Sequence, residues 1–193
     1  MAQAYTAGGG GFAREDVQAR LTIRPPRPTS SCESEATDYQ LIVEQVILPL
    51  ITNSTRPTRL LLAGYSAGSL AASRFRRPTS LPPTSPISLS YLLISYPLSV
   101  IRFLALFHSS TFHAALAELA RSGAPVLALY GDGDQFTGVA KYDAWAARMG
   151  AQGGAGWNSV LVEGADHFWQ ERERKGELLA AVRGWSGKGH DAA

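Results

Sequence analysis

The sequence contains one cysteine, Cys32, in 193 residues, and its formal net charge is only +2. A single cysteine allows neither an intrachain disulfide nor a paired-cysteine zinc or redox site. The small net charge gives no electrostatic reason to expect nucleic-acid binding. Arg74, Arg76 and Arg77 cluster beside a proline-rich stretch, and we interpret them as a solvated patch. A reducing compartment, the cytoplasm, is the expected location.

The sequence also lacks the marks of a signal peptide and of a clear membrane span. The first twenty residues have no continuous apolar core and include Arg14, Glu15 and Asp16. Residues 87–107 are mostly apolar over nearly the length of a span, but they contain serines, a proline and Arg102, and a charge inside a membrane is costly. We therefore expect a buried strand over 89–95, a loop and a partly buried segment, with a membrane span as the less favoured alternative.

Composition changes along the chain and predicts one domain with irregular ends. Residues 1–35 include the glycine run 8–11 and a Pro/Arg-rich stretch at 24–28, so we expect an irregular N-terminal segment. The glycine run lacks the Lys-Ser/Thr pair of a phosphate-binding P-loop. Hydrophobic residues make up 45% and charged residues 18% of the chain, which is typical of globular proteins. We expect the domain over 36–186 and a polar tail over 187–193.

Helical and extended patterns alternate within this domain. Apolar residues between Tyr39 and Leu50 recur at helical spacing, and Thr37 with Gln40 has the form of a capping box at the helix start. Further helices are predicted after residue 68 and over 111–122, 139–149 and 176–185, and strands over 59–63, 89–95, 125–130 and 158–162. The alternation predicts an α/β domain with a mostly parallel sheet, in which the loops at the carboxyl ends of the strands share one edge.

The pentapeptide Gly64–Gly68, Gly-Tyr-Ser-Ala-Gly, has the form of a nucleophile elbow. It follows the apolar run 60–63 and precedes small residues that favour a helix. In such an elbow a serine lies on a strained strand-to-helix turn, and the glycines let the two backbones approach closely. We therefore predict that Ser66 is a nucleophile. The alternative for the bare motif is an ordinary Gly/Ser loop.

Two later loops supply the partners that a serine nucleophile needs. Asp134 follows the strand at 125–130, and His167 follows the strand at 158–162. An imidazole has a pKa near neutrality and accepts the serine proton, while a carboxylate on its other nitrogen fixes the tautomer. Asp132 is the alternative acid, and Asp166 is expected to be a loop aspartate. The remaining histidines are expected to be structural or packing residues, or to lie in the tail: His108, His113 and His190.

Residues 36–186 resemble the α/β-hydrolase superfamily, especially small dienelactone-hydrolase-like and serine-aminopeptidase-like hydrolases of fungal type. The resemblance lies in three motifs, 60–68, 126–134 and 162–168, which occur in the superfamily's order of Ser, Asp and His. It implies a parallel sheet flanked by helices, a Ser66–His167–Asp134 triad, and an oxyanion hole with the Ala67 N–H as one donor. It implies a small acyl substrate and neither a metal nor a cofactor.

The chain departs from this pattern upstream of the elbow. The second oxyanion donor of the superfamily comes from a loop after an early strand, but only 17–23 resembles a strand before residue 59. We therefore expect a domain shortened on its N-terminal side, with early strands missing, as from a truncated gene model. Loss of one oxyanion donor costs about a hundred- to a thousand-fold in turnover. The leading hypothesis is a serine hydrolase that cleaves a carboxylic ester; the alternatives are a serine peptidase and an impaired or non-catalytic binding protein.

Overall fold

The computed structural model describes residues 33–51, 58–79, 81, 84–85, 87–104 and 108–187. The glycine run 8–11, the strand candidate 17–23 and the tail with His190 lie outside these residues. The domain boundaries at 36 and 186 stay predictions.

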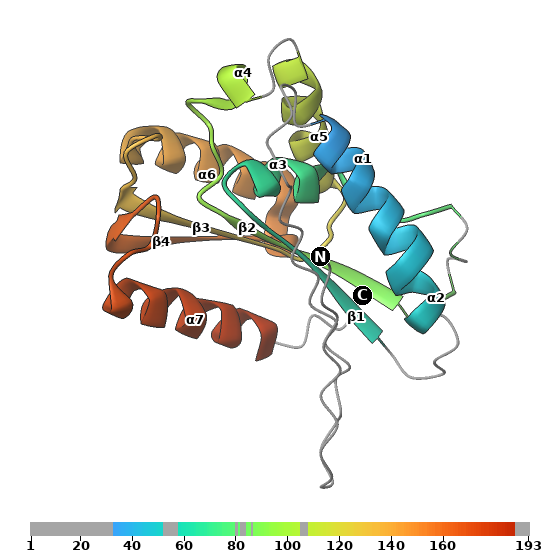
Figure 1. Ribbon diagram of the computed structural model, residues 1–193. Coiled ribbons are helices and arrows are strands. Elements are labelled where there is room, and N and C mark those ends of the chain that lie inside the picture. The colour runs from blue at the N-terminus through green and yellow to red at the C-terminus, as the bar shows by residue number, and fades with distance from the viewer. Residues whose placement is uncertain are drawn as a thin grey trace, which may run out of the picture.

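Four strands form one parallel sheet, and they lie side by side in their order along the chain. The strands are β1 (Thr58–Tyr65), β2 (Ile87–Ile94), β3 (Val126–Gly133) and β4 (Trp157–Asp166). Each connection therefore crosses back along the sheet, and all four carboxyl ends meet at one edge (Figure 1). The expectation of a parallel sheet flanked by helices is confirmed. Within the described residues β1, the strand before the elbow, is at the border of the sheet.

Helices cover both faces of this sheet. They are α1 (Glu33–Ile42), α2 (Leu48–Ile51), α3 (Ala67–Arg74), α4 (Ile101–Leu104), α5 (Ser109–Arg121), α6 (Val139–Gly153) and α7 (Arg172–Gly187). A π-helical turn, η1 (Val43–Ile47), joins α1 to α2, and a short 3-10 turn, η3 (Gly154–Gly156), precedes β4. Figure 1 shows α1, α3, α5 and α6 on one face and α7 on the other. Among the described helices, none is long and apolar enough to cross a membrane.

The alternating side chains of the strands fill two cores. Leu60 and Leu62 of β1 belong to the large core beneath α1, α3, α5 and α6, whereas Leu61 and Ala63 pack with the core beneath α7. β3 divides in the same way, with Ala128 in the first core. Burial on both faces explains why this strand is almost continuously apolar in sequence.

Several predicted element boundaries need correction, including those of β3, which extends to Gly133, and α6, which extends to Gly153. The first helix begins at Glu33, so Thr37 and Gln40 lie inside it and do not form the predicted capping box. Gln40 instead donates to Glu44, one turn later. The last strand extends to Asp166 and the last helix begins at Arg172, both beyond the predicted limits. Short propensity patterns miss these extensions because strand pairing and packing on the sheet stabilise residues whose own sequence pattern is weak.

Candidate active site

Ser66 lies on the sharp turn between β1 and α3. Its backbone has φ 50° and ψ −123°, a region that residues with a side chain rarely adopt. The neighbouring strand holds this turn, because the Ser66 N–H donates to the Ile94 carbonyl at 2.9 Å. The turn places a partly exposed serine at the carboxyl edge of the sheet, as a nucleophile elbow does.

The two glycines of the pentapeptide differ in the space around them. A Cβ on Gly64 would lie 2.3 Å from the Gly68 carbonyl oxygen, so this position requires glycine for the strand and helix to approach. A Cβ on Gly68 would meet nothing within 4 Å. The expectation that both glycines are needed for close packing is therefore correct for Gly64 and wrong for Gly68.

The structure brings Ser66, His167 and Asp134 into one hydrogen-bonded chain. His167 Nε2 lies 2.9 Å from Ser66 Oγ, and His167 Nδ1 lies 2.7 Å from Asp134 Oδ2. The imidazole and the carboxylate are buried, with residue exposures of 3% and 6%. Ser66 is the more exposed member, so the chain of contacts runs from the interior to an accessible hydroxyl.

The Asp134 carboxylate has four hydrogen-bond partners. Oδ1 accepts the backbone N–H groups of Phe136 and Thr137 at 2.8 and 3.0 Å. Oδ2 accepts the hydroxyl of Tyr142 at 3.0 Å in addition to facing His167. These contacts hold the buried carboxylate in one orientation. Burial and the Asp134 charge both raise the pKa of Tyr142, so its hydroxyl stays a donor.

Asp132, the alternative acid, has a different partner. Its Oδ1 accepts the Gly164 N–H at 2.6 Å, across from β3 to β4. The pairing of the two strands shifts there, since Gly131 faces Val162 but Gly133 faces Asp166. Such an irregularity bends a strand and redirects the side chains that follow. The Asp132–Gly164 hydrogen bond therefore links β3 to β4 at this register shift, just before the segments that carry Asp134 and His167.

The other predicted aspartate and histidines lie apart from this chain of contacts. Asp166 is the last residue of β4, not the expected loop residue, and its Oδ1 accepts the Gln170 N–H at 3.1 Å. His108 is half-buried just before α5. His113 is exposed on α5, so its expected packing role is wrong.

Sequence reasoning missed several residues around His167. Gln135 Oε1 accepts the His167 N–H at 3.1 Å, and the Tyr65 hydroxyl donates to the His167 carbonyl at 3.0 Å. The Phe136 ring meets the imidazole edge-on at 4.6 Å, and the Phe168 ring is 5.4 Å away. Tyr65 lies within the pentapeptide and Phe136 is two residues after Asp134, yet only the folded structure shows that their side chains meet at His167.

Ala67, the predicted oxyanion donor, is the first residue of α3. The first N–H groups of a helix have no carbonyl partner within the helix. The part of the chain described ahead of β1 is helical over residues 33–51 and contains no strand-to-loop junction. The predicted source of a second donor therefore lies outside the described residues. Within those residues, no three His, Cys, Asp or Glu side chains are grouped to hold a metal ion.

Comparison with solved structures identifies the fold. A putative α/β hydrolase from Agrobacterium tumefaciens matches with a TM-score of 0.58 at 16% identity, over 89% of this chain and 72% of its own. The chain has an α/β-hydrolase fold. An esterase from Pyrococcus furiosus matches with a TM-score of 0.57 at 17% identity, over 88% of this chain and 70% of its own.

A third structure shows how much of the fold is shared. An α/β serine hydrolase homologue from Coxiella burnetii matches with a TM-score of 0.53 at 17% identity, over 85% of this chain. This chain spans 66% of that protein's length. No family model matches the sequence, and no curated protein matches it significantly. In this fold Ser66, Asp134 and His167 directly follow β1, β3 and β4 at the carboxyl edge of the sheet, where active sites of open α/β sheets form.

Proposed function

We propose that the protein is a serine hydrolase that cleaves a carboxylic ester or a related acyl bond. The hydrogen-bonded series Ser66 Oγ, His167 Nε2, His167 Nδ1 and Asp134 Oδ2, at 2.9 and 2.7 Å, is the observation that carries the proposal. The elbow conformation of Ser66 supports it independently. Solved structures of this fold include an esterase domain from Rhodothermus marinus and the esterase from Pyrococcus furiosus, which is consistent with the proposal.

The geometry suits acyl transfer in two steps. Ser66 Oγ attacks the acyl carbon while His167 Nε2 takes the hydroxyl proton, and the Ala67 N–H donates to the oxyanion. Nε2 then returns the proton to the leaving alcohol, which leaves an acyl-serine. Water, deprotonated by the same nitrogen, releases the acid and restores Ser66. Asp134 stays charged throughout and stabilises the imidazolium.

Exposed aromatic rings favour an apolar acyl or alcohol group. Tyr65, Phe136 and Phe168 are 44%, 42% and 53% exposed and surround the His167 ring. A substrate bound at Ser66 gains contact area against them, since burying apolar surface yields about 25 cal/mol per Å². Ser66 and His167 line neither the cavity at Arg76 and Tyr91 nor the cavity at Arg102 and Lys141.

Labelling by a fluorophosphonate probe tests the proposal. We expect the folded protein to form a covalent adduct at Ser66 and to hydrolyse short p-nitrophenyl esters. Ser66→Ala should abolish both signals, whereas Ser110→Ala, at an exposed serine of α5, should leave them unchanged. A folded wild-type protein that is not labelled, or labelling that survives Ser66→Ala, contradicts a serine hydrolase. Comparing the rates of hydrolysis of matched ester and amide substrates distinguishes an esterase from a peptidase.

A non-catalytic binding protein is the second candidate, and one observation favours it. No strand precedes β1 within the described residues, so only one oxyanion donor, the Ala67 N–H, is proposed. A protein of this kind retains the Ser66–His167 contact but turns over no ester. Rapid fluorophosphonate labelling without ester turnover would favour this candidate.

A further inference from the structure

A basic groove lies where α4, α5 and α6 meet, apart from the three triad residues. Its volume is about 460 Å³, within the range of small-ligand sites. Four basic side chains from the three helices line it: Arg102 of α4, His113 of α5, and Lys141 and Arg148 of α6. Ser99 and the buried Trp145 line it as well. We call this feature the basic groove.

The basic groove contains uncompensated positive charge. No acidic side chain lines it, and none of its four bases forms an ion pair within the described residues. The pKa of His113 is lowered by burial and then by Arg148, Lys141 and Arg102, so all three cations act on one imidazole. Like charges held this close repel one another, and an anion between them relieves the repulsion.

Hydrogen-bond donors accompany the charges. Lys141 Nζ donates to Ser99 Oγ at 3.3 Å, which fixes the lysine at the wall of the groove. Arg102 and Arg148 line the same groove and bring further N–H donors. A ligand that brings several oxygen acceptors therefore suits this group of side chains.

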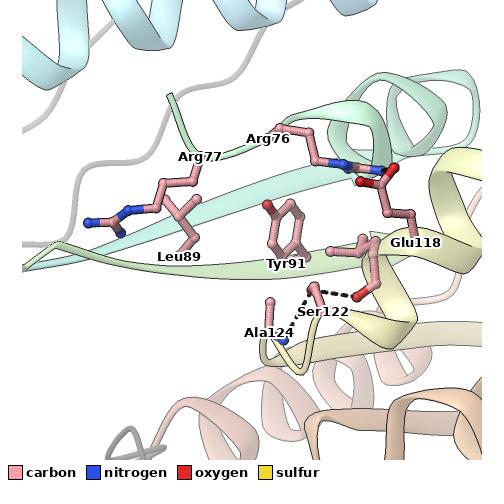
Figure 2. A pocket seen from close by; sticks show the side chains of 8 residues that line it. Arg76, Arg77, Leu89, Tyr91, Glu118, Ser122 and Ala124 are labelled. Atoms are coloured by element: carbon pink, nitrogen blue, oxygen red, sulfur yellow. Dashed lines mark hydrogen bonds and ion pairs between the residues drawn. The ribbon is translucent and has the colours of Figure 1, made fainter. Parts of the chain in front are cut away.

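A second cavity, of about 330 Å³, also contains arginines, but there the protein provides partners for their charges (Figure 2). There Arg76 donates to the carbonyls of Ser73, Phe75 and Ala115 and pairs with Glu118 at 3.3 Å. Arg77 extends away from that pair, and one of its nitrogens donates to the Ile87 carbonyl. The protein itself supplies a carboxylate and several carbonyls in this cavity, whereas in the basic groove it supplies only the Ser99 hydroxyl, to Lys141, and no carboxylate.

We propose that the basic groove binds a small molecule through a phosphate or sulfate group. A tetrahedral anion with two or more charges accepts hydrogen bonds from guanidinium and ammonium groups at once. The concave shape and limited volume favour a small phosphorylated or sulfated compound over a nucleic-acid strand. The proposal does not depend on the hydrolase activity, because none of the lining residues belongs to the triad.

The basic groove is nevertheless joined to the acid of the triad. The Ser99 N–H donates to Thr137 Oγ1 at 3.3 Å, and the Thr137 N–H donates to Asp134 Oδ1 at 3.0 Å. Ser99 is therefore two hydrogen bonds from the carboxylate that faces His167. A ligand that orders Ser99 and Lys141 acts on the loop that carries Asp134.

Calorimetric titration of the full chain with sodium pyrophosphate and with sodium sulfate, at fixed low ionic strength, tests the proposal. We expect saturable binding of one ion per chain. Lys141→Gln/Arg148→Gln should weaken it about tenfold or more, because two charge-assisted contacts are lost. Arg121→Gln/Arg183→Gln, which removes the same charge from exposed positions on α5 and α7, should change it less than twofold.

The outcomes separate a site from general attraction. All four substituted side chains are exposed, so circular dichroism should show folded proteins in every case. No saturable binding of either ion to the wild-type chain overturns the proposal. Equal weakening in the two double variants also overturns it, because the effect then follows net charge and not position.

The pH dependence of sulfate binding adds a readout specific to His113. Sulfate keeps its charge from pH 5 to 8, so any change in affinity comes from the protein. Arg102 from α4 and Lys141 and Arg148 from α6 face His113, and their charges lower its pKa below 6.5. We expect affinity to rise as the pH falls below 6.5 and the rise to disappear in His113→Asn. A rise that persists in His113→Asn overturns the role of His113 in the basic groove.

Discussion

Ser66 combines backbone strain with a hydrogen-bonded side chain. A residue with φ 50° and ψ −123° stores about 1 to 3 kcal/mol of conformational strain. The Ser66–Ile94 backbone contact and the packing of α3 against β1 and β2 offset this cost. The side chain is thereby presented to His167 at a turn that Gly64 makes possible.

Gly64→Ala and Gly68→Ala should therefore differ in their effect on stability. At Gly64 a Cβ clashes with the Gly68 backbone, so we expect a loss of about 1 to 3 kcal/mol or more in the free energy of unfolding. At Gly68 a Cβ meets open space inside a helix, and alanine should stabilise by about 0.5 to 1 kcal/mol. Urea unfolding measures both, and equal destabilisation would contradict the difference.

Asp134→Asn and Asp132→Asn should separate the two aspartates of the acid loop. Asparagine at 134 keeps the shape but loses the charge facing His167, so we expect kcat to fall about 10⁴-fold. Asparagine at 132 keeps an acceptor for the Gly164 N–H and should change kcat only a few fold. Ester hydrolysis at saturating substrate measures both. A larger loss at Asp132 would reverse the assignment.

At the scale of elements, β3 and β4 bring the acid and the histidine together. A Cβ on Gly131 would lie 2.0 Å from the Ala165 carbonyl oxygen, so the two strands touch where their register shifts. The shift sends one strand end toward Asp134 and the other toward His167. Their loops also cross-link, since Gln135 accepts the His167 N–H. The hydrogen-bonded arrangement of Ser66, His167 and Asp134 thus depends on pairing between strands rather than on either loop alone.

Helix α7 covers one whole face of the described sheet and should be essential for stability. Leu178, Ala181, Val182 and Trp185 lie on one side of it and pack on β2 and β3. Trp185 is 6% exposed, so Trp185→Ala should cost about 3 to 5 kcal/mol. Leu179, on the solvent side at 51% exposure, is the matched control, and Leu179→Ala should cost less than about 0.5 kcal/mol. Thermal unfolding compares them; similar melting temperatures would contradict this packing.

Across the whole molecule, buried tyrosines should make the fold sensitive to alkali. Burial raises the pKa of Tyr91 to about 12 and raises the pKa of Tyr39, Tyr96 and Tyr142 further. The unfolded chain loses these protons near pH 10 while the folded chain keeps them, so stability falls as pH rises above 10. Each such tyrosine contributes about 1.4 kcal/mol per pH unit.

Urea unfolding at pH 9, 10 and 11 checks this expectation. The midpoint should be level up to pH 10 and then fall. Tyr96→Phe, which removes one fully buried hydroxyl, should make the decline shallower by one proton. A midpoint that is constant to pH 11 would show that the tyrosines ionise without unfolding.

Much of the fold and the site could be predicted because the signals are local. Continuous apolar runs mark β1 and β3, and the pentapeptide marks the turn at Ser66. The extension of β4 to Asp166 could not be predicted, because residues 163–166 join the strand only through pairing with β3. The convergence of Phe136 and Phe168 on His167 likewise requires two loops to meet.

By itself, the sequence determined the alternation of helices and strands, the elbow at Ser66 and the order of Ser66, Asp134 and His167, since each depends on neighbouring residues. Tertiary structure alone decided which aspartate faces the histidine. Asp132 is near the end of β3 and Asp134 directly follows the strand, and the register shift between β3 and β4 accompanies contacts of one with Gly164 and of the other with His167. Tertiary structure also brought together the side chains of the basic groove, which lie on three separate helices. Contacts between distant segments depend on packing and strand register, and local pattern does not encode either.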